Sequence, residues 1–233
     1  MKTNASSTSS RASAPLSYFI MENSPHQPPQ DCSLCPRLAK FRFENRETYP
    51  DFYNRPVPSF GPINAALLIV GLAPGLKGAN QTGRPFTGDY AGDLLYSTLI
   101  RLGLARGKYD RRADDSFELQ GVRVTNAVRC VPPKNKPLPI EIKTCFRFLE
   151  SEISTMVELR AILSLGQIAH NAVSATFGIR RKDYPFAHGA ITKINNLNLV
   201  SSYHCSRYNT NTRVLTPVMF EAAMQKAKVA AGL

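Results

Sequence analysis

Residues 65–89 read AALLIVGLAPGLKGANQTGRPFTGD and join an apolar run to a loop rich in glycine and proline. The run 65–70 has the length and the apolar character of a buried strand. The loop 71–89 contains five glycines and two prolines and ends in the carboxylate of Asp89. Because glycine and proline interrupt regular structure, the sequence predicts that a long, bare loop leaves the end of this strand.

Short apolar runs alternate along the chain with segments of helical spacing. The sequence predicts strands at residues 67–70, 122–126, 161–165 and 197–202, and helices at residues 89–102, 140–156, 168–177 and 214–231. This alternation is typical of a parallel sheet with helices on both faces. The expected fold is therefore α/β, a single three-layer domain with a central four-stranded, mostly parallel sheet flanked by helices. Ligands of such folds bind at the carboxyl ends of the strands.

Composition bounds the class of protein. A chain of 233 residues with 43% hydrophobic content and a mean hydropathy of -0.21 can bury a full core. No apolar run is long enough to cross a membrane, so no membrane partner is expected. The net charge of +12 favours nucleic acid as the partner. An anionic membrane surface, small acidic substrates, or charge that only keeps the protein soluble are the alternatives.

The first residues differ in composition from the rest. Residues 1–29 are rich in Ser, Ala, Pro and Asn, have no acidic residue before Glu22, and show neither helical nor strand periodicity. They are expected to form a disordered tail before a domain at 30–233. An organelle transit peptide is the alternative, although its arginine pattern is thin. The expected location is a bacterial cytoplasm or nucleoid.

The glycine-rich loop has a competing interpretation as a dinucleotide-binding fingerprint. Its glycines Gly71, Gly75 and Gly78 do not have the GxGxxG spacing, and Pro74 interrupts the turn into the helix. Asp89 does not end a second strand, where a ribose-binding acid belongs. A nucleotide-dependent small-molecule enzyme is therefore disfavoured. This loop lets a ligand approach the main chain closely and then presents an aromatic ring and a carboxylate. It is better suited to binding a flat ring.

Four cysteines form a second group. They are Cys32, Cys35, Cys130 and Cys145. Four thiolates suit zinc or an iron–sulfur cluster, and spacing alone does not separate the two, although zinc is the simpler expectation. Prolines next to three of these cysteines argue against four unrelated core thiols. The odd total of five cysteines argues against a disulfide framework.

A third group follows the last predicted strand. Residues 203–213 read YHCSRYNTNTR and place His204 at the same sheet edge as the glycine-rich loop. Small polar and basic side chains follow it and suit a DNA groove or phosphates. A polar loop that only caps the next helix is the alternative.

Three ordered stretches carry a family resemblance. GLAPGLKGANQTGRPFTGDYAGDLL at 71–95, VTNAVRCVPPKNKP at 124–137 and SYHCSRYNTNT at 202–212, together with the four cysteines, resemble the motifs of the uracil-DNA glycosylase superfamily. The similarity runs from Cys32 to the C-terminal helix and is greatest to family 5. Family 4 has a carboxylate in the GEAPG motif where this chain has Leu72.

The resemblance implies a DNA glycosylase that flips uracil out of DNA, hydrolyses its N-glycosidic bond and initiates base excision repair. Phe86 would stack on the base, and the amide of Asn126 would pair with uracil O4 and N3–H, a pattern that cytosine reverses. His204 would hydrogen-bond the charge on O2 of the departing base. Asp89 would orient water and stabilise the cationic sugar. Its position also fits a helix N-cap, and both roles can hold at once.

The resemblance implies two further sets of contacts. Bare backbone at Gly71, Ala73 and Gly75 would approach the extruded base. The residues expected to contact DNA are Lys77, Asn80, Arg84, Lys134, Ser206, Arg207, Asn209 and Arg213. No lysine occupies a position suited to Schiff-base attack, so a monofunctional enzyme that leaves an abasic site is expected. Other deaminated bases such as hypoxanthine are expected substrates.

The same resemblance changes the expected cofactor from zinc to a structural [4Fe-4S] cluster held by the four cysteines. The fifth cysteine, Cys205, stands where the family usually has proline in a His-Pro-Ser motif. The expected partner is DNA that contains uracil or other deaminated bases, bound by a monomer. A non-catalytic DNA-binding protein stabilised by a metal cluster is the alternative function.

Overall fold

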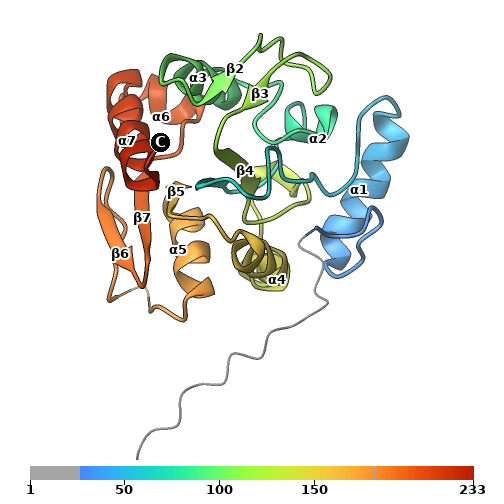
Figure 1. Cartoon of the computed structure of the whole chain (residues 1–233). Coiled ribbons are helices and arrows are strands. Elements are labelled where there is room, and N and C mark those ends of the chain that lie inside the picture. The colour runs from blue at the N-terminus through green and yellow to red at the C-terminus, as the bar shows by residue number, and fades with distance from the viewer. Residues whose placement is uncertain (1–26, 181) are drawn as a thin grey trace, which may run out of the picture.

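The computed structural model describes residues 27–180 and 182–233. The tail expected at 1–29 therefore lies, for residues 1–26, outside the described residues. Figure 1 shows a central sheet enclosed by helices. The elements are α1 Pro36–Thr48, β1 Leu67–Gly71, α2 Ala79–Thr82, α3 Tyr90–Arg101, β2 Ala105–Arg106, β3 Glu118–Leu119, β4 Val122–Asn126, a 3-10 turn Pro133–Asn135, α4 Pro139–Thr155, β5 Ala161–Leu165, α5 Gln167–Thr176, β6 Ile191–Ile194, β7 Leu197–Ser202, α6 Arg207–Asn211 and α7 Pro217–Ala231.

The central sheet has five strands in the order β4-β1-β5-β7-β6, not the four that we predicted. The predicted α/β class and the mostly parallel pairing are confirmed, because β4, β1, β5 and β7 run parallel. The missed strand, β6, is antiparallel to β7. It is short and partly exposed, and the two-residue turn that joins it to β7 begins at Asn195, with a φ of 52°. Asn-Asn is a weak hairpin signal, which explains the omission.

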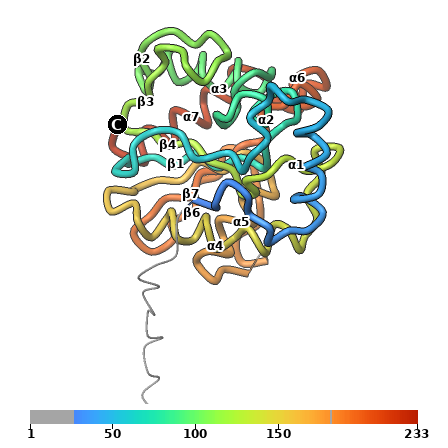
Figure 2. The backbone as a smooth tube through the Cα atoms, turned by 90° about the vertical axis from the view of Figure 1, so that its right-hand side faces the viewer, coloured from blue at the N-terminus to red at the C-terminus, as the bar shows by residue number. Residues whose placement is uncertain are grey.

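The two faces of the sheet follow the alternation of side chains along each strand. In β1, Leu67 and Ile69 pack in one core with residues of α3 and α7, whereas Leu68 and Val70 pack in a second core with residues of α4 and α5. Figure 2 shows these helix pairs on opposite sides of the strands. The three-layer arrangement therefore follows from strands that are apolar on both faces.

Helix α1 and the hairpin β2-β3 lie outside these layers and were not predicted, and neither were the short helices α2 and α6. Helix α1 buries Leu38, Arg42 and Asn45, so most of its buried face is polar and gives no apolar periodicity. The short hairpin β2-β3 extends from the end of α3 as a separate two-stranded sheet. Among helices of the described residues, none is both long and apolar enough to cross a bilayer.

The topology brings three chain segments together at one edge. Gly71 at the end of β1 pairs with Asn126 at the end of β4. Strand β7 ends at Ser202, two residues before His204, and runs parallel to its neighbour β5. The glycine-rich loop, the segment after β4 and the histidine loop therefore leave the sheet at the same edge, as predicted.

Candidate active site

The missing side chain of Gly71 brings two predicted site residues together. A Cβ at this position would lie 2.4 Å from Asn126 Oδ1 and 2.4 Å from Phe86 Cζ. No L side chain fits there unless one of these groups moves. We had expected the bare backbone to accommodate the nucleotide. The structure gives a different reason at Gly71: glycine makes room for the ring and the amide.

Asn126 is buried with unused hydrogen-bonding capacity. It is 3% exposed, and its Oδ1 has no hydrogen-bond partner. A buried acceptor without a partner costs about 1 to 3 kcal/mol. Buried polar atoms of native proteins are seldom left in this state, and functional sites are where the exceptions have a use. Five other buried side-chain atoms of the described residues also lack a partner, and Asn126 is the residue among them that ends a strand of the sheet beside Phe86. Its amide is therefore the best candidate for a group that pairs with a ligand.

Phe86 and His204 form one wall of the same site. Their ring centroids lie 6.0 Å apart, with an angle of 28° between the ring planes. Phe86 is buried and adopts a φ of 54°, in the left-handed region. Such a conformation is a genuine outlier for a bulky residue. The ring direction is therefore set by contacts around the loop rather than by local preference.

His204 is a neutral imidazole at physiological pH. Burial lowers its pKa to about 4. Its main-chain carbonyl accepts a hydrogen bond of 2.8 Å from Asn209 Nδ2. A neutral imidazole can donate one N–H to a developing anion while it carries no charge itself. The geometry thus provides a donor next to the stacked rings.

Asp89 caps helix α3 and also faces the glycine-rich loop. Its Oδ1 accepts a hydrogen bond of 3.0 Å from the N–H of Gly92. Its Oδ2 lies 2.6 Å from the place where a Cβ of Gly78 would be, and 3.4 Å from that of Gly75. Burial raises the pKa of Asp89 above its usual value. The capping role is present, and a desolvated carboxylate in the same place remains available for chemistry.

The loop after β1 does not form a phosphate-binding helix start. The helix that follows, α2, spans only four residues, Ala79–Thr82. Ala73 packs against the cysteine-containing core cluster, so any contact with a base is expected from its main chain. These observations agree with the sequence argument against a dinucleotide fold. The glycines make room for Asp89, Phe86 and Asn126.

Four of the residues predicted to contact DNA are exposed. They are Lys77, Lys134, Arg207 and Arg213. Ser206 instead caps α6 by accepting a hydrogen bond from the N–H of Asn209, while the side chain of Asn209 holds the main chain of His204. Ser206 and Asn209 therefore shape the histidine loop. Their exposure is intermediate, which leaves room for contact with a phosphate.

Two of the predicted DNA contacts are wrong. Asn80 is 1% exposed and donates from Nδ2 to Asn54 Oδ1 at 2.9 Å. Arg84 is 4% exposed, and its guanidinium forms a two-point ion pair with Asp115 at 2.7 and 2.8 Å. Sequence alone gave no sign of these partners, because Asn54 and Asp115 are 26 and 31 residues away along the chain. Both side chains support the loop from inside.

The four cysteines predicted to bind a metal line one cavity between α1, α4 and the segment after β4. Cys130 and Cys145 are buried, whereas Cys32 and Cys35 are partly buried. Burial, followed by the charge of neighbouring Cys145, raises the pKa of Cys35 to about 11 and that of Cys130 to about 12. Within 27–180 and 182–233, no three His, Cys, Asp or Glu side chains converge as they would around one metal ion.

Two N–H donors point at these sulfurs. Arg42 Nη1 lies 3.5 Å from Cys130 Sγ, and the main-chain N–H of Arg129 lies 3.4 Å from Cys145 Sγ. Donors of this kind stabilise thiolates and adjust the properties of iron–sulfur sites. The four thiols around one cavity are the residues that could hold a thiolate-ligated metal group.

Sequence reasoning missed Gly92, which the site requires. A Cβ there would lie 1.6 Å from the carbonyl oxygen of Phe86. Glycine in the first turn of a helix has no capping use at that position, and this was the available signal.

Comparison with known proteins gives the family. The model of the "Uracil DNA glycosylase superfamily" matches residues 58–228. The "Type-5 uracil-DNA glycosylase" of Thermus thermophilus is 45% identical over 208 residues, 87% of this chain and 94% of that protein. The protein of the same name from Mycobacterium tuberculosis is 39% identical over 87% of this chain and 79% of its own length.

A more distant relative is the "Type-4 uracil-DNA glycosylase" of Pyrobaculum aerophilum, 34% identical over 66% of this chain and 65% of that protein. The resemblance stated from the motifs is confirmed. The chain belongs to the uracil-DNA glycosylase superfamily, as a relative of its type-5 members.

Proposed function

We propose that this protein is a monofunctional DNA glycosylase that hydrolyses the N-glycosidic bond of uracil in DNA and so initiates base excision repair. The single observation that carries the proposal is the buried, unpartnered Oδ1 of Asn126 beside the ring of Phe86. A flipped base would supply what these two side chains lack: a flat face for the ring and a polar edge for the amide.

Base selection follows from the two ends of the Asn126 amide. The Oδ1 atom accepts from uracil N3–H, and the Nδ2 group donates to uracil O4. Cytosine presents an acceptor at N3 and a donor at C4, so two like groups would face each other. Leaving both ends of a buried amide unpaired is costly, so cytosine is rejected more strongly than its similar shape suggests.

Bond cleavage divides charge between base and sugar. As the bond from C1′ to N1 breaks, its electron pair stays with uracil, and an N–H of neutral His204 stabilises the resulting anion at O2. The carboxylate of Asp89 stabilises the positive sugar and orients the water that attacks C1′. The water oxygen becomes the hydroxyl of the abasic sugar, and its released proton restores neutral uracil.

DNA binding would rest on the exposed cations rather than on all the predicted ones. Lys77 and Lys134 lie in the loops after β1 and β4, and Arg207 begins helix α6 after the histidine loop. Each cation that neutralises a phosphate releases counterions, which makes affinity dependent on salt. A monomer suits these contacts.

The four cysteines would hold a [4Fe-4S] cluster. Their arrangement around one cavity and the N–H donors at two of the sulfurs support it. Zinc is the second candidate for the same four thiolates. When bound, the cluster would act as a structural cross-link between α1, α4 and the segment that follows Asn126. Hydrolysis needs no electron transfer.

The test uses duplexes that contain one uracil opposite guanine, one hypoxanthine opposite thymine, or neither. Wild type and Asn126→Ala are compared with Asn196→Ala, an exposed asparagine in the turn between β6 and β7 at the opposite edge of the sheet. We expect alkali-dependent cleavage at uracil by wild type and Asn196→Ala, and at least a hundredfold slower cleavage by Asn126→Ala.

Three outcomes would contradict parts of this proposal. A folded wild type that binds DNA but releases no uracil would favour the non-catalytic alternative. A nicked product without alkali would exclude the monofunctional mechanism. Equal rates for wild type and Asn126→Ala would exclude the assigned role of the amide.

A further inference from the structure

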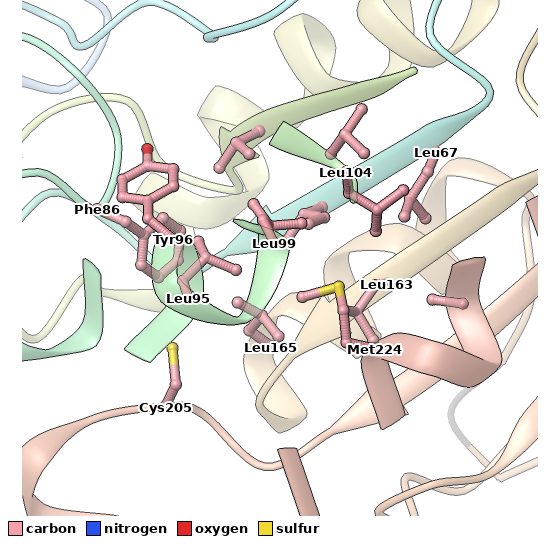
Figure 3. Packing of buried hydrophobic residues seen from close by; sticks show 14 of the residues in the cluster. Leu67, Phe86, Leu95, Tyr96, Leu99, Leu104, Leu163, Leu165, Cys205 and Met224 are labelled. Atoms are coloured by element: carbon pink, nitrogen blue, oxygen red, sulfur yellow. The ribbon is translucent and has the colours of Figure 1, made fainter. Parts of the chain in front are cut away.

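The main chain around Phe86 accepts hydrogen bonds from two tyrosine hydroxyls that have no part in the proposed chemistry. Tyr109 Oη donates to the carbonyl oxygen of Phe86 at 3.3 Å and lies 3.4 Å from the N–H of Gly88, which donates to it. The hydroxyl of Tyr96 donates to the carbonyl oxygen of Pro85. Figure 3 shows Phe86 and Tyr96 together beside helix α3. Peptide groups on both sides of the ring are therefore fixed.

The same loop is anchored by the guanidinium of Arg84. Besides its ion pair with Asp115, Arg84 donates from Nε to Thr87 Oγ1 at 2.8 Å. Four aromatic rings surround the guanidinium carbon at 5.0–5.7 Å, those of Phe60, Tyr96, Tyr109 and Phe117. Cation–π contact and a two-point carboxylate pair suit a desolvated arginine. Arg84 thus connects the loop to the segment that carries Tyr109 and Asp115.

These contacts offset an unfavourable backbone conformation. A left-handed φ of 54° at Phe86 costs on the order of 1 to 2 kcal/mol for a residue other than glycine. Gly92 permits the carbonyl of Phe86 to lie against α3, because a Cβ there would be 1.6 Å from its oxygen. Strained residues persist only where the surroundings determine them strongly, and such residues cluster at functional sites.

We propose that Tyr109 is a positioning residue for base excision: its hydroxyl holds Phe86 in the conformation that turns the ring toward His204 and Asn126. This inference rests on the proposed function. It gives a function to the segment between α3 and β4. This segment carries Tyr109 and Asp115 and lies outside the central sheet. Tyr109 acts through the main chain of Phe86 rather than by contact with the base.

The test removes one oxygen atom. Tyr109→Phe keeps the ring over Arg84 and deletes the hydroxyl, and Tyr49→Phe is the matched control, because the ring of Tyr49 stacks on Phe52. Four quantities are measured: the single-turnover rate on uracil duplex, the Kd for free uracil, the Kd for undamaged duplex, and Tm. We expect Tyr109→Phe to lower the rate and the uracil affinity by about twofold to tenfold. Duplex affinity should match that of Tyr49→Phe, and Tm should fall only slightly further, because one hydrogen bond that stabilises the loop is lost.

The outcomes separate this inference from the proposed function. A wild type that does not excise uracil would overturn both. An active wild type with unchanged rate and uracil affinity in Tyr109→Phe would overturn only the positioning role. A fall in duplex affinity and Tm that parallels the fall in rate would show that the hydroxyl serves general stability, and would also overturn it.

Discussion

Asn126, the last residue of strand β4, and Glu152 of helix α4 are both buried polar residues, yet they differ in how well they are paired. Glu152 is fully buried, and its two carboxylate oxygens accept from Arg123 at 2.7 Å and from Arg129 at 2.5 Å. Asn126 lies between these two arginines in the sequence, and its Oδ1 has no partner. A buried polar group whose hydrogen-bonding atoms all have partners stabilises the fold. A buried polar group with an unpaired atom can form its missing hydrogen bond with a ligand.

The largest expected effect is on stability and comes from removing the charge of Glu152, the fully paired residue of the two. Glu152→Gln leaves Arg123 and Arg129 without their shared countercharge. Removing one partner of a buried pair costs about 3 to 5 kcal/mol. We therefore expect the free energy of unfolding in urea to fall by this amount, with the excision rate per folded molecule unchanged at low temperature. A rate that fell while stability held would mean that Glu152 belongs to the chemistry.

The second prediction concerns Asp89, for which we expect a large loss of activity without a loss of stability. Asp89→Asn keeps an N-cap, since asparagine caps as well as aspartate, but removes the carboxylate that we propose stabilises the sugar. We expect excision to slow about 100- to 1000-fold. Burial raises the pKa of Asp89 above its unfolded value, so the ionised carboxylate destabilises the folded state above that pKa. At neutral pH the variant should therefore be at least as stable as wild type, measured by thermal unfolding. A large loss of Tm with activity retained would reduce Asp89 to a cap.

The third prediction concerns pH. Burial lowers the pKa of His204 from 6.5 in the unfolded chain to about 4 in the folded protein. The folded state therefore loses stability as pH falls from 6.5 toward 4, because the unfolded chain takes up the proton first. His204→Gln should remove about 2 kcal/mol of this acid-induced loss, less than the full shift because the residue as a whole is only partly buried. Urea unfolding of both proteins at several pH values measures it. Parallel pH profiles would show that His204 is not desolvated.

The sequence accounts for much of this comparison but not all of it. Strand ends and ordered motifs gave Asn126, His204 and Asp89, because those signals are local in the chain. The pairing of Arg84 with Asp115, and of Asn80 with Asn54, depends on side chains brought together only by folding. Charge and loop position had therefore suggested a DNA contact where the structure has a buried anchor.

The smallest expected effect tests whether Lys77, and not Arg84, contacts DNA. Lys77 is exposed and in a loop beside the site, so Lys77→Ala should weaken duplex binding a fewfold and reduce the slope of log K against log salt by about one. Arg84→Lys should leave the slope unchanged while it lowers Tm, because lysine cannot form the two-point pair with Asp115. Fluorescence anisotropy at several salt concentrations measures both. Equal slope changes for the two variants would restore Arg84 to the DNA surface.

The central claim is that the open hydrogen-bonding capacity of Asn126 exists for uracil. Its most direct test is the ¹H–¹⁵N spectrum of the side-chain amides and arginine Nε groups, recorded as free uracil or free cytosine is added. We expect uracil to shift the Asn126 amide strongly, with little change at Arg123 and Arg129, and cytosine to have far less effect. An Asn126 amide that does not respond to uracil, or that responds equally to cytosine, would contradict the account.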